Sequence, residues 1–126
     1  MTFKYQDDRS NARYSYTGKK RDGRKIYFVE ESFSYEHGKF LIVVPRGFLT
    51  DLASIPSIPF MPKPGASLWD DAAIVHDRAL HSSYNITREE ADDLFYYALL
   101  DRGCTRFTAT VLWLAVRIGS FIFGEK

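Results

Sequence analysis

Apolar and polar residues alternate along the first third of the chain, a pattern typical of half-buried β-strands. Residues 12–17 place alanine and tyrosines on one face, and arginine, serine and threonine on the other. A second such segment covers residues 25–35, with an irregularity at residues 30–32, and a third covers residues 39–44. Turns that contain glycine separate the segments. The pattern predicts a three-strand antiparallel meander.

The second half of the chain carries apolar residues at helical spacing. We expect three helices, over residues 67–81, 87–103 and 105–123. The second begins with the sequence Thr-Arg-Glu-Glu from Thr87, which is a capping box. Four prolines between Pro56 and Pro64, closed by Gly65, forbid regular structure there. The predicted fold class is therefore α+β.

The last helix is apolar enough to raise the question of a membrane span. Arg106 and Arg117 interrupt it, and a central arginine is costly in a bilayer. One stripe at helical spacing is formed by Phe107, Val111, Leu114, Ile118 and Phe121. Since the opposite side is apolar too, we interpret this segment as a central, well-covered core helix. An exposed apolar side that meets another subunit is the alternative.

Size and composition indicate one domain, with a sheet at 1–44, a loop at 45–66 and helices at 67–123. The single cysteine excludes an internal disulfide and a cysteine zinc site. The N-terminus lacks the apolar core of a signal peptide, so we expect synthesis in the cytoplasm.

Charge is unevenly distributed: residues 1–50 carry a net +4 and residues 51–126 a net −3. The basic side chains gather at one predicted turn, at Lys19, Lys20, Arg21, Arg24 and Lys25. We interpret this cluster as a solvated hairpin tip. No broad basic face with interleaved aromatic residues accompanies it, so nucleic-acid binding is not expected.

Polar residues interrupt an otherwise core-like part of the chain. They are Thr50, Asp51, Ser54, His76 and Asp77, with Asp92 beside the apolar stripe of the second helix. One imidazole and several carboxylates suit a hard divalent cation, which gives Asp51, His76, Asp77 and Asp92 as candidate ligands. The same set suits acid–base catalysis by His76, with Asp77 and Asp51 as the other candidate catalytic residues.

A structural network is the competing interpretation. Arg117 projects from a nearly all-apolar helix and needs an anion, and a buried carboxylate needs a cation. Arg117 with Asp77 or Asp92 satisfies both. Thr50 and Ser54 then only fold the loop around Asp51, through side-chain bonds to the backbone. The residues alone leave both interpretations open.

Four segments carry a resemblance to a known family. They are Pro45-Arg-Gly-Phe-Leu-Thr-Asp-Leu-Ala-Ser-Ile-Pro56, Ala72-Ala-Ile-Val-His-Asp77, Arg88-Glu-Glu-Ala-Asp-Asp-Leu-Phe95 and Ala115-Val-Arg117. In these segments the chain resembles a phage and prophage family known as domain of unknown function 1353. The resemblance implies a viral or prophage origin and does not imply an activity.

Two functions from different classes follow. One is a non-enzymatic virion or tail-associated component that uses its aromatic surface to bind other phage proteins or further copies of itself. The other is a small metal-dependent or His/Asp hydrolase that acts on the host cell wall during entry or lysis. The lack of a complete catalytic set in the sequence favours the first.

Overall fold

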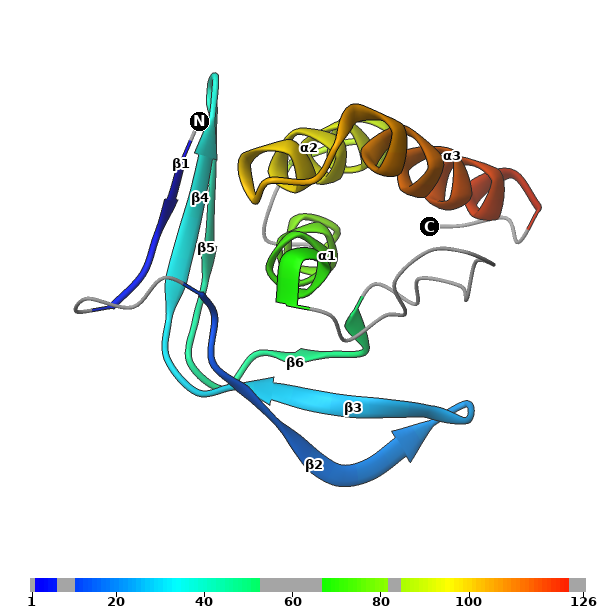
Figure 1. Ribbon diagram of the computed structural model, residues 1–126. Coiled ribbons are helices and arrows are strands. Elements are labelled where there is room, and N and C mark those ends of the chain that lie inside the picture. The colour runs from blue at the N-terminus through cyan, green and yellow to red at the C-terminus, as the bar shows by residue number, and fades with distance from the viewer. Residues whose placement is uncertain (1, 7–10, 53–66, 82–84, 123–126) are drawn as a thin grey trace.

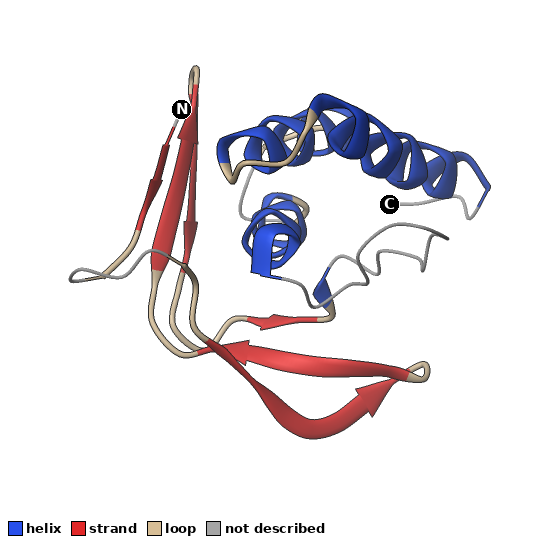
Figure 2. Cartoon of the chain, viewed as in Figure 1, coloured by secondary structure: helices blue, strands red, loops and turns tan. Residues whose placement is uncertain are grey.

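The computed structural model describes residues 2–6, 11–52, 67–81 and 85–122. Two small antiparallel sheets occupy the N-terminal half and three helices follow, which confirms the α+β class (Figures 1 and 2). One sheet has the order β1-β4-β5, formed by Thr2–Lys4, Phe33–His37 and Phe40–Val44. The other has the order β2-β3-β6, formed by Tyr14–Arg21, Arg24–Val29 and Leu49–Thr50.

The strand expected over residues 25–35 is divided between the two sheets. It breaks after Val29, at the expected irregularity, so that β3 belongs to one sheet and β4 to the other. Backbone hydrogen bonds hold the break: Glu30 N donates to Arg13 O at 2.8 Å, and Val29 N donates to Phe48 O at 3.0 Å. The expected single meander is thus divided into two hairpins, β2-β3 and β4-β5, one in each sheet. Strands β6 and β1 complete these sheets by pairing with strands distant in sequence.

The helices are α1 (Ser67–Ala79), α2 (Arg88–Asp101) and α3 (Arg106–Ile122). Helices α1 and α2 both contact the β1-β4-β5 sheet, α1 through β5 and α2 through β4, and α3 packs against α2 (Figure 1). Its inner residues pack with the inward side chains of the strands. This core includes Phe33, Tyr35, Ile42, Val44, Trp69, Ala73, Phe95 and Leu99.

The capping box of α2 is confirmed. Thr87 Oγ1 accepts a hydrogen bond from Glu90 N at 3.0 Å, and Glu90 Oε1 accepts one from Thr87 N at 3.0 Å. These two bonds satisfy backbone donors that a helix start otherwise leaves without partners. At the other end Gly103 takes a φ of 100°, where a residue without Cβ is favoured.

The interpretation of α3 as a central, covered helix is wrong. Helix α3 packs against α2 through Ala109, Leu112 and Val116, which are buried. Three residues of the stripe expected in the core face solvent instead: Phe107 is 72 % exposed, Leu114 45 % and Ile118 51 %. Both faces are apolar, so periodicity alone did not reveal which one packs. In the described part of the chain, no helix combines the length and apolar character needed to cross a membrane.

Candidate functional site

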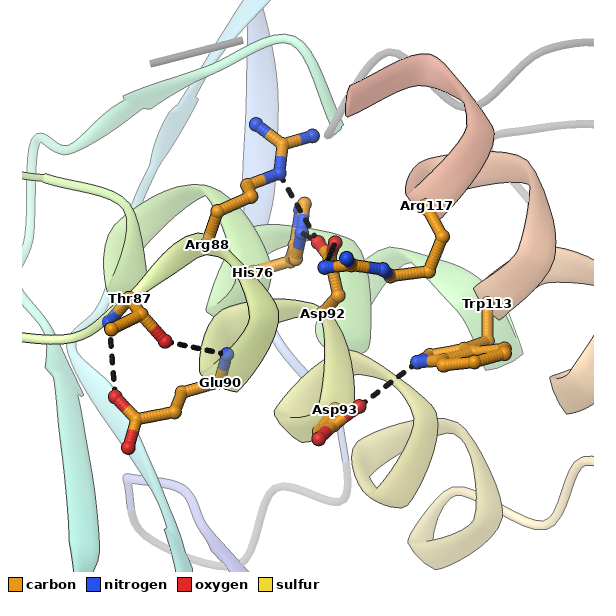
Figure 3. A network of polar contacts seen from close by, with 8 residues as sticks. All are labelled: His76, Thr87, Arg88, Glu90, Asp92, Asp93, Trp113 and Arg117. Carbon is orange, nitrogen blue, oxygen red and sulfur yellow. Dashed lines mark hydrogen bonds and ion pairs between the residues drawn. The ribbon is translucent and has the colours of Figure 1, made fainter. Parts of the chain in front are cut away.

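The carboxylate of Asp92 joins all three helices (Figure 3). His76 Nε2 of α1 lies 2.6 Å from Asp92 Oδ1, and Arg117 Nη1 of α3 lies 3.0 Å from Asp92 Oδ2. Arg88, one turn earlier on α2, adds an ion pair of 3.3 Å between its Nε and Asp92 Oδ1. Asp92 is fully buried, and we call these four residues the Asp92 cluster.

Helical spacing explains how the Asp92 cluster assembles. Ala91, Leu94 and Phe95 form the buried side of α2, and Asp92 shares that side. Arg88 precedes Asp92 by four residues, the spacing at which oppositely charged side chains meet on one helix face. His76 follows Ala73 on the buried face of α1, so its ring points toward α2.

The hydrogen bond with Asp92 assigns the tautomer of His76. A carboxylate only accepts, so Nε2–H of His76 donates to Asp92 Oδ1. The ring packs against Phe95, with centroids 5.3 Å apart. His76 Nδ1 is buried and has no hydrogen-bond partner among the residues that the structure describes. The imidazole is therefore held through Nε2, while Nδ1 is buried without a hydrogen bond to a described residue.

Asp77 and Thr50 form a second contact, between α1 and β6. The hydroxyl of Thr50 donates to Asp77 Oδ2 and accepts from the backbone N–H of Leu52 at 2.9 Å. Leu52 adopts a positive φ of 64°, a strained conformation for a branched residue. Thr50 therefore fixes the first turn of the loop that leaves β6, as expected for a residue that shapes the loop.

Asp51 points to a different partner. Its Oδ2 lies 3.4 Å from Arg24 Nη1 on β3, and its side chain is 22 % exposed. Ser54 lies outside the described residues. Within the described ranges no three or more His, Cys, Asp or Glu side chains form a group able to hold a metal ion. The structure thus joins His76 with Asp92 and Arg117, and gives Asp77 and Asp51 separate contacts.

Another buried carboxylate, that of Asp71, was not anticipated from the sequence. Asp71 of α1 accepts from the Tyr5 hydroxyl and from Ala12 N at 3.2 Å, and Arg102 Nε lies 3.5 Å from its Oδ2. Burial raises the pKa of Asp71, while Tyr5 and Arg102 act in the opposite direction. Burial also raises the pKa of Tyr5 well above its usual range, and Asp71 adds to that effect.

The contacts of Asp71 could not be predicted from a local sequence pattern, because Tyr5 and Asp71 are 66 residues apart. The same separation joins the Tyr35 hydroxyl on β4 to Asp101 at the end of α2. The pair of Arg88 and Asp92 is different. Its spacing of four residues on one helix is a local signal from which the ion pair could have been predicted. The polar groups that hold sheet and helices together are thus mostly long-range pairs.

The contacts of the Asp92 cluster hold the three helices together. Both carboxylate oxygens are engaged by cationic or N–H groups from its own chain. A His–Asp pair is half of a catalytic arrangement, which also needs a nucleophile or a bound water that the histidine activates. Among the described residues no hydroxyl or thiol contacts the His76 ring; Phe95 does. Chemically, the cluster neutralises a buried carboxylate.

Comparisons with known proteins give one match. The family model described as protein of unknown function (DUF1353) matches residues 27–116. The matched segment includes β4, β5 and β6, all of α1 and α2, and most of α3. It therefore contains His76, Arg88 and Asp92 of the Asp92 cluster and the contact between Thr50 and Asp77, and it ends one residue before Arg117. No curated protein and no solved structure matches.

Proposed function

The chain belongs to the DUF1353 family, and from that premise we propose that it is a non-enzymatic phage or prophage protein, a virion or tail-associated component that works by binding partners. The phage origin rests on the resemblance of the Pro45–Pro56 and Ala72–Asp77 segments to phage and prophage proteins. The absence of catalysis rests on how the candidate residues are used in the fold.

One observation carries the proposal: Asp92 is fully buried and its two oxygens hold His76, Arg88 and Arg117 from three helices. A carboxylate so engaged stabilises the packing of the helices, and burial keeps it away from solvent. Two of the candidate site residues, His76 and Asp92, thus have a structural use. Large apolar side chains remain exposed on several elements, among them Tyr16, Leu41, Leu49 and Phe107, and these supply surface for partners.

The environment of one nitrogen atom favours a second candidate function, the metal-dependent or His/Asp hydrolase. His76 Nδ1 is buried and makes no hydrogen bond to a described residue, and such atoms usually have a partner in a protein. A metal ion or an activated water bound to this nitrogen would give His76 a catalytic use. The two candidates therefore differ in what His76 does, and that difference can be measured.

The first experiment tests whether the protein is a component of phage particles. Particles purified by density gradient from a host that carries this gene are analysed by mass spectrometry, and the supernatant is analysed in parallel. We expect the chain in the particles at a fixed ratio to a major tail or head protein. Its presence in the lysate and its absence from intact particles would contradict the proposal.

The second experiment separates structure from catalysis at His76. We expect the purified protein to contain no stoichiometric metal, and His76→Gln to lower the free energy of unfolding by about 1–3 kcal/mol through the lost bond to Asp92. His81→Gln is the control, since His81 is exposed. Stoichiometric metal that is lost in a stably folded His76→Gln protein would establish the hydrolase candidate instead.

A further inference from the structure

Helix α3 presents an apolar stripe to solvent on the side opposite its contact with α2. Phe107 is 72 % exposed, Leu114 45 % and Ile118 51 %, and Val111 between them is half-buried. The buried residues of the same helix, Ala109, Leu112 and Val116, already pack in the core. The exposed stripe is thus in addition to what the fold needs for its own stability.

The spacing along this stripe is that of a coiled-coil seam. Phe107, Val111, Leu114 and Ile118 follow one another at intervals of four, three and four residues. This alternation assigns Val111 and Ile118 to heptad position a, and Phe107 and Leu114 to position d. β-Branched residues at a with leucine at d favour two-stranded pairing. The stripe is therefore shaped for one other helix with the same kind of seam.

The charges beside the seam suit a second copy of the same chain. The flanking e and g positions hold Thr108, Ala115, Thr110 and Arg117. The only charged group in this set, the Arg117 guanidinium, points inward to Asp92 at 3.0 Å (Figure 3). Two such stripes meeting about a two-fold axis bring no like charges together. They also offer no unpaired charge to attract an acidic or basic partner.

We propose that α3 pairs with α3 of a second copy through the seam Phe107–Val111–Leu114–Ile118, so that this chain is one of its own binding partners. The inference rests on the proposed function, because it names one partner of a partner-binding protein. The described seam is only about 17 Å long, from eleven steps of 1.5 Å between Phe107 and Ile118. Stable dimers bury about 800 Å² on each partner, so four side chains predict a weak, concentration-dependent dimer.

Sedimentation velocity over a concentration series tests the pairing. For the wild-type protein we expect the average mass to move from monomer toward dimer between roughly 5 µM and roughly 500 µM, as a small interface predicts. Leu114→Glu places two carboxylates opposite each other and should keep the protein monomeric over the same range. Leu41→Glu is the matched control, since Leu41 on β5 is 53 % exposed and lies off the seam.

A pair of variants with opposite charges at Leu114 tests whether α3 contacts the same helix of a second copy. Leu114→Glu and Leu114→Lys should each be monomeric, and an equimolar mixture of the two should recover the dimer. Thermal unfolding of each variant checks that the exposed substitution leaves the fold intact. A wild type that stays monomeric throughout, a Leu41→Glu variant as defective as Leu114→Glu, or a mixture that does not recover would each overturn the pairing.

The outcomes also separate this inference from the proposed function. A monomer that is present in purified particles overturns the pairing and leaves the binding function standing. A dimer that is absent from particles and holds stoichiometric metal supports the pairing and overturns the proposed function. Dimerisation together with presence in particles supports both.

Discussion

Arg117 Nη1 lies 3.0 Å from Asp92 Oδ2, and the carboxylate that receives it is fully buried. This pair adds a polar link between α3 and α2 to the apolar packing of Ala109, Leu112 and Val116. Because His76 and Arg88 engage the other oxygen of Asp92, the carboxylate is a common anchor for three helices. Loss of either side of the pair leaves charge uncompensated in the interior.

Asp92→Asn should be strongly destabilising. The amide keeps the shape of the side chain, but it removes the negative charge that His76, Arg88 and Arg117 share, so we expect a loss of about 3–5 kcal/mol in the free energy of unfolding. The neighbouring exposed residue provides the control. Asp93 accepts a bond from Trp113 Nε1 at 3.0 Å on the surface, and Asp93→Asn should cost less than about 1 kcal/mol. Urea denaturation measures both, and equal losses would contradict the anchor role.

Arg117→Met should destabilise by up to about 3–5 kcal/mol, because it strands Asp92 without its cation from α3. Arg106→Met, an exposed arginine on the same helix, should stay within about 0.5 kcal/mol of wild type. The double variant with Asp92→Asn should be less destabilised than the sum of the two single variants, since the second change removes a partner already lost. Additive losses in the urea midpoints would show that the two residues do not act together.

Thr87→Ala removes the side-chain half of the capping box. The Glu90 N–H loses its acceptor at 3.0 Å, so we expect a loss of about 1 kcal/mol. Thr110→Ala, an exposed threonine in the interior of α3, is the control and should be neutral or slightly stabilising, since alanine has the higher helix propensity. Thermal unfolding of the two variants side by side gives the comparison, and the predicted order is Thr87→Ala below Thr110→Ala.

The protein should lose stability in alkaline solution through Tyr5 and Tyr35. Burial, reinforced by Asp71 and Asp101, raises the pKa of both hydroxyls well above the usual value of about 10. Above pH ~10 the unfolded chain releases these protons and the folded chain holds them, so the unfolding free energy falls as pH rises. Denaturant midpoints from about pH 8 to about pH 11 measure this slope.

The Tyr5→Phe, Tyr35→Phe double variant is the control for the alkaline effect. It lacks both buried hydroxyls, so its midpoint should fall less steeply above pH ~10, although the two lost hydrogen bonds lower its stability at neutral pH. An unchanged slope in the double variant would assign the alkaline loss to other groups. The ultraviolet absorbance of tyrosinate, followed in the same samples, reports when the phenols ionise.

Local features of the fold were predictable because their causes are local. The capping box depends on Thr87 and Glu90, three residues apart, and the three helices follow from periodicity within each segment. The break near residues 30–32 was visible as a defect in alternation. Its consequence, a change of sheet, was not visible, because it depends on the pairing of β1 and β6 with distant strands.

The same distinction between local and long-range causes applies to the candidate site. Arg117 was expected to pair with Asp77 or Asp92 because a cation on an apolar helix needs an anion, and the structure pairs it with Asp92. Asp51 was grouped with His76 because both are polar residues in an otherwise core-like part of the chain, yet it contacts Arg24 on β3, the strand that pairs with β6. Which apolar face of α3 is buried depended on where α2 lies, and that position is a property of the whole fold.

The bonds from Tyr5 to Asp71 and from Tyr35 to Asp101 bear on the order of folding. Each closes a loop of 66 residues, and contacts of such sequence separation form late and slow the folding of a chain. During synthesis the strands leave the ribosome well before the helices that cover Tyr35 and Ile42. Until α1 and α2 arrive, the sheets expose their apolar face, and this interval is when nascent chains are most exposed to aggregation and to chaperones.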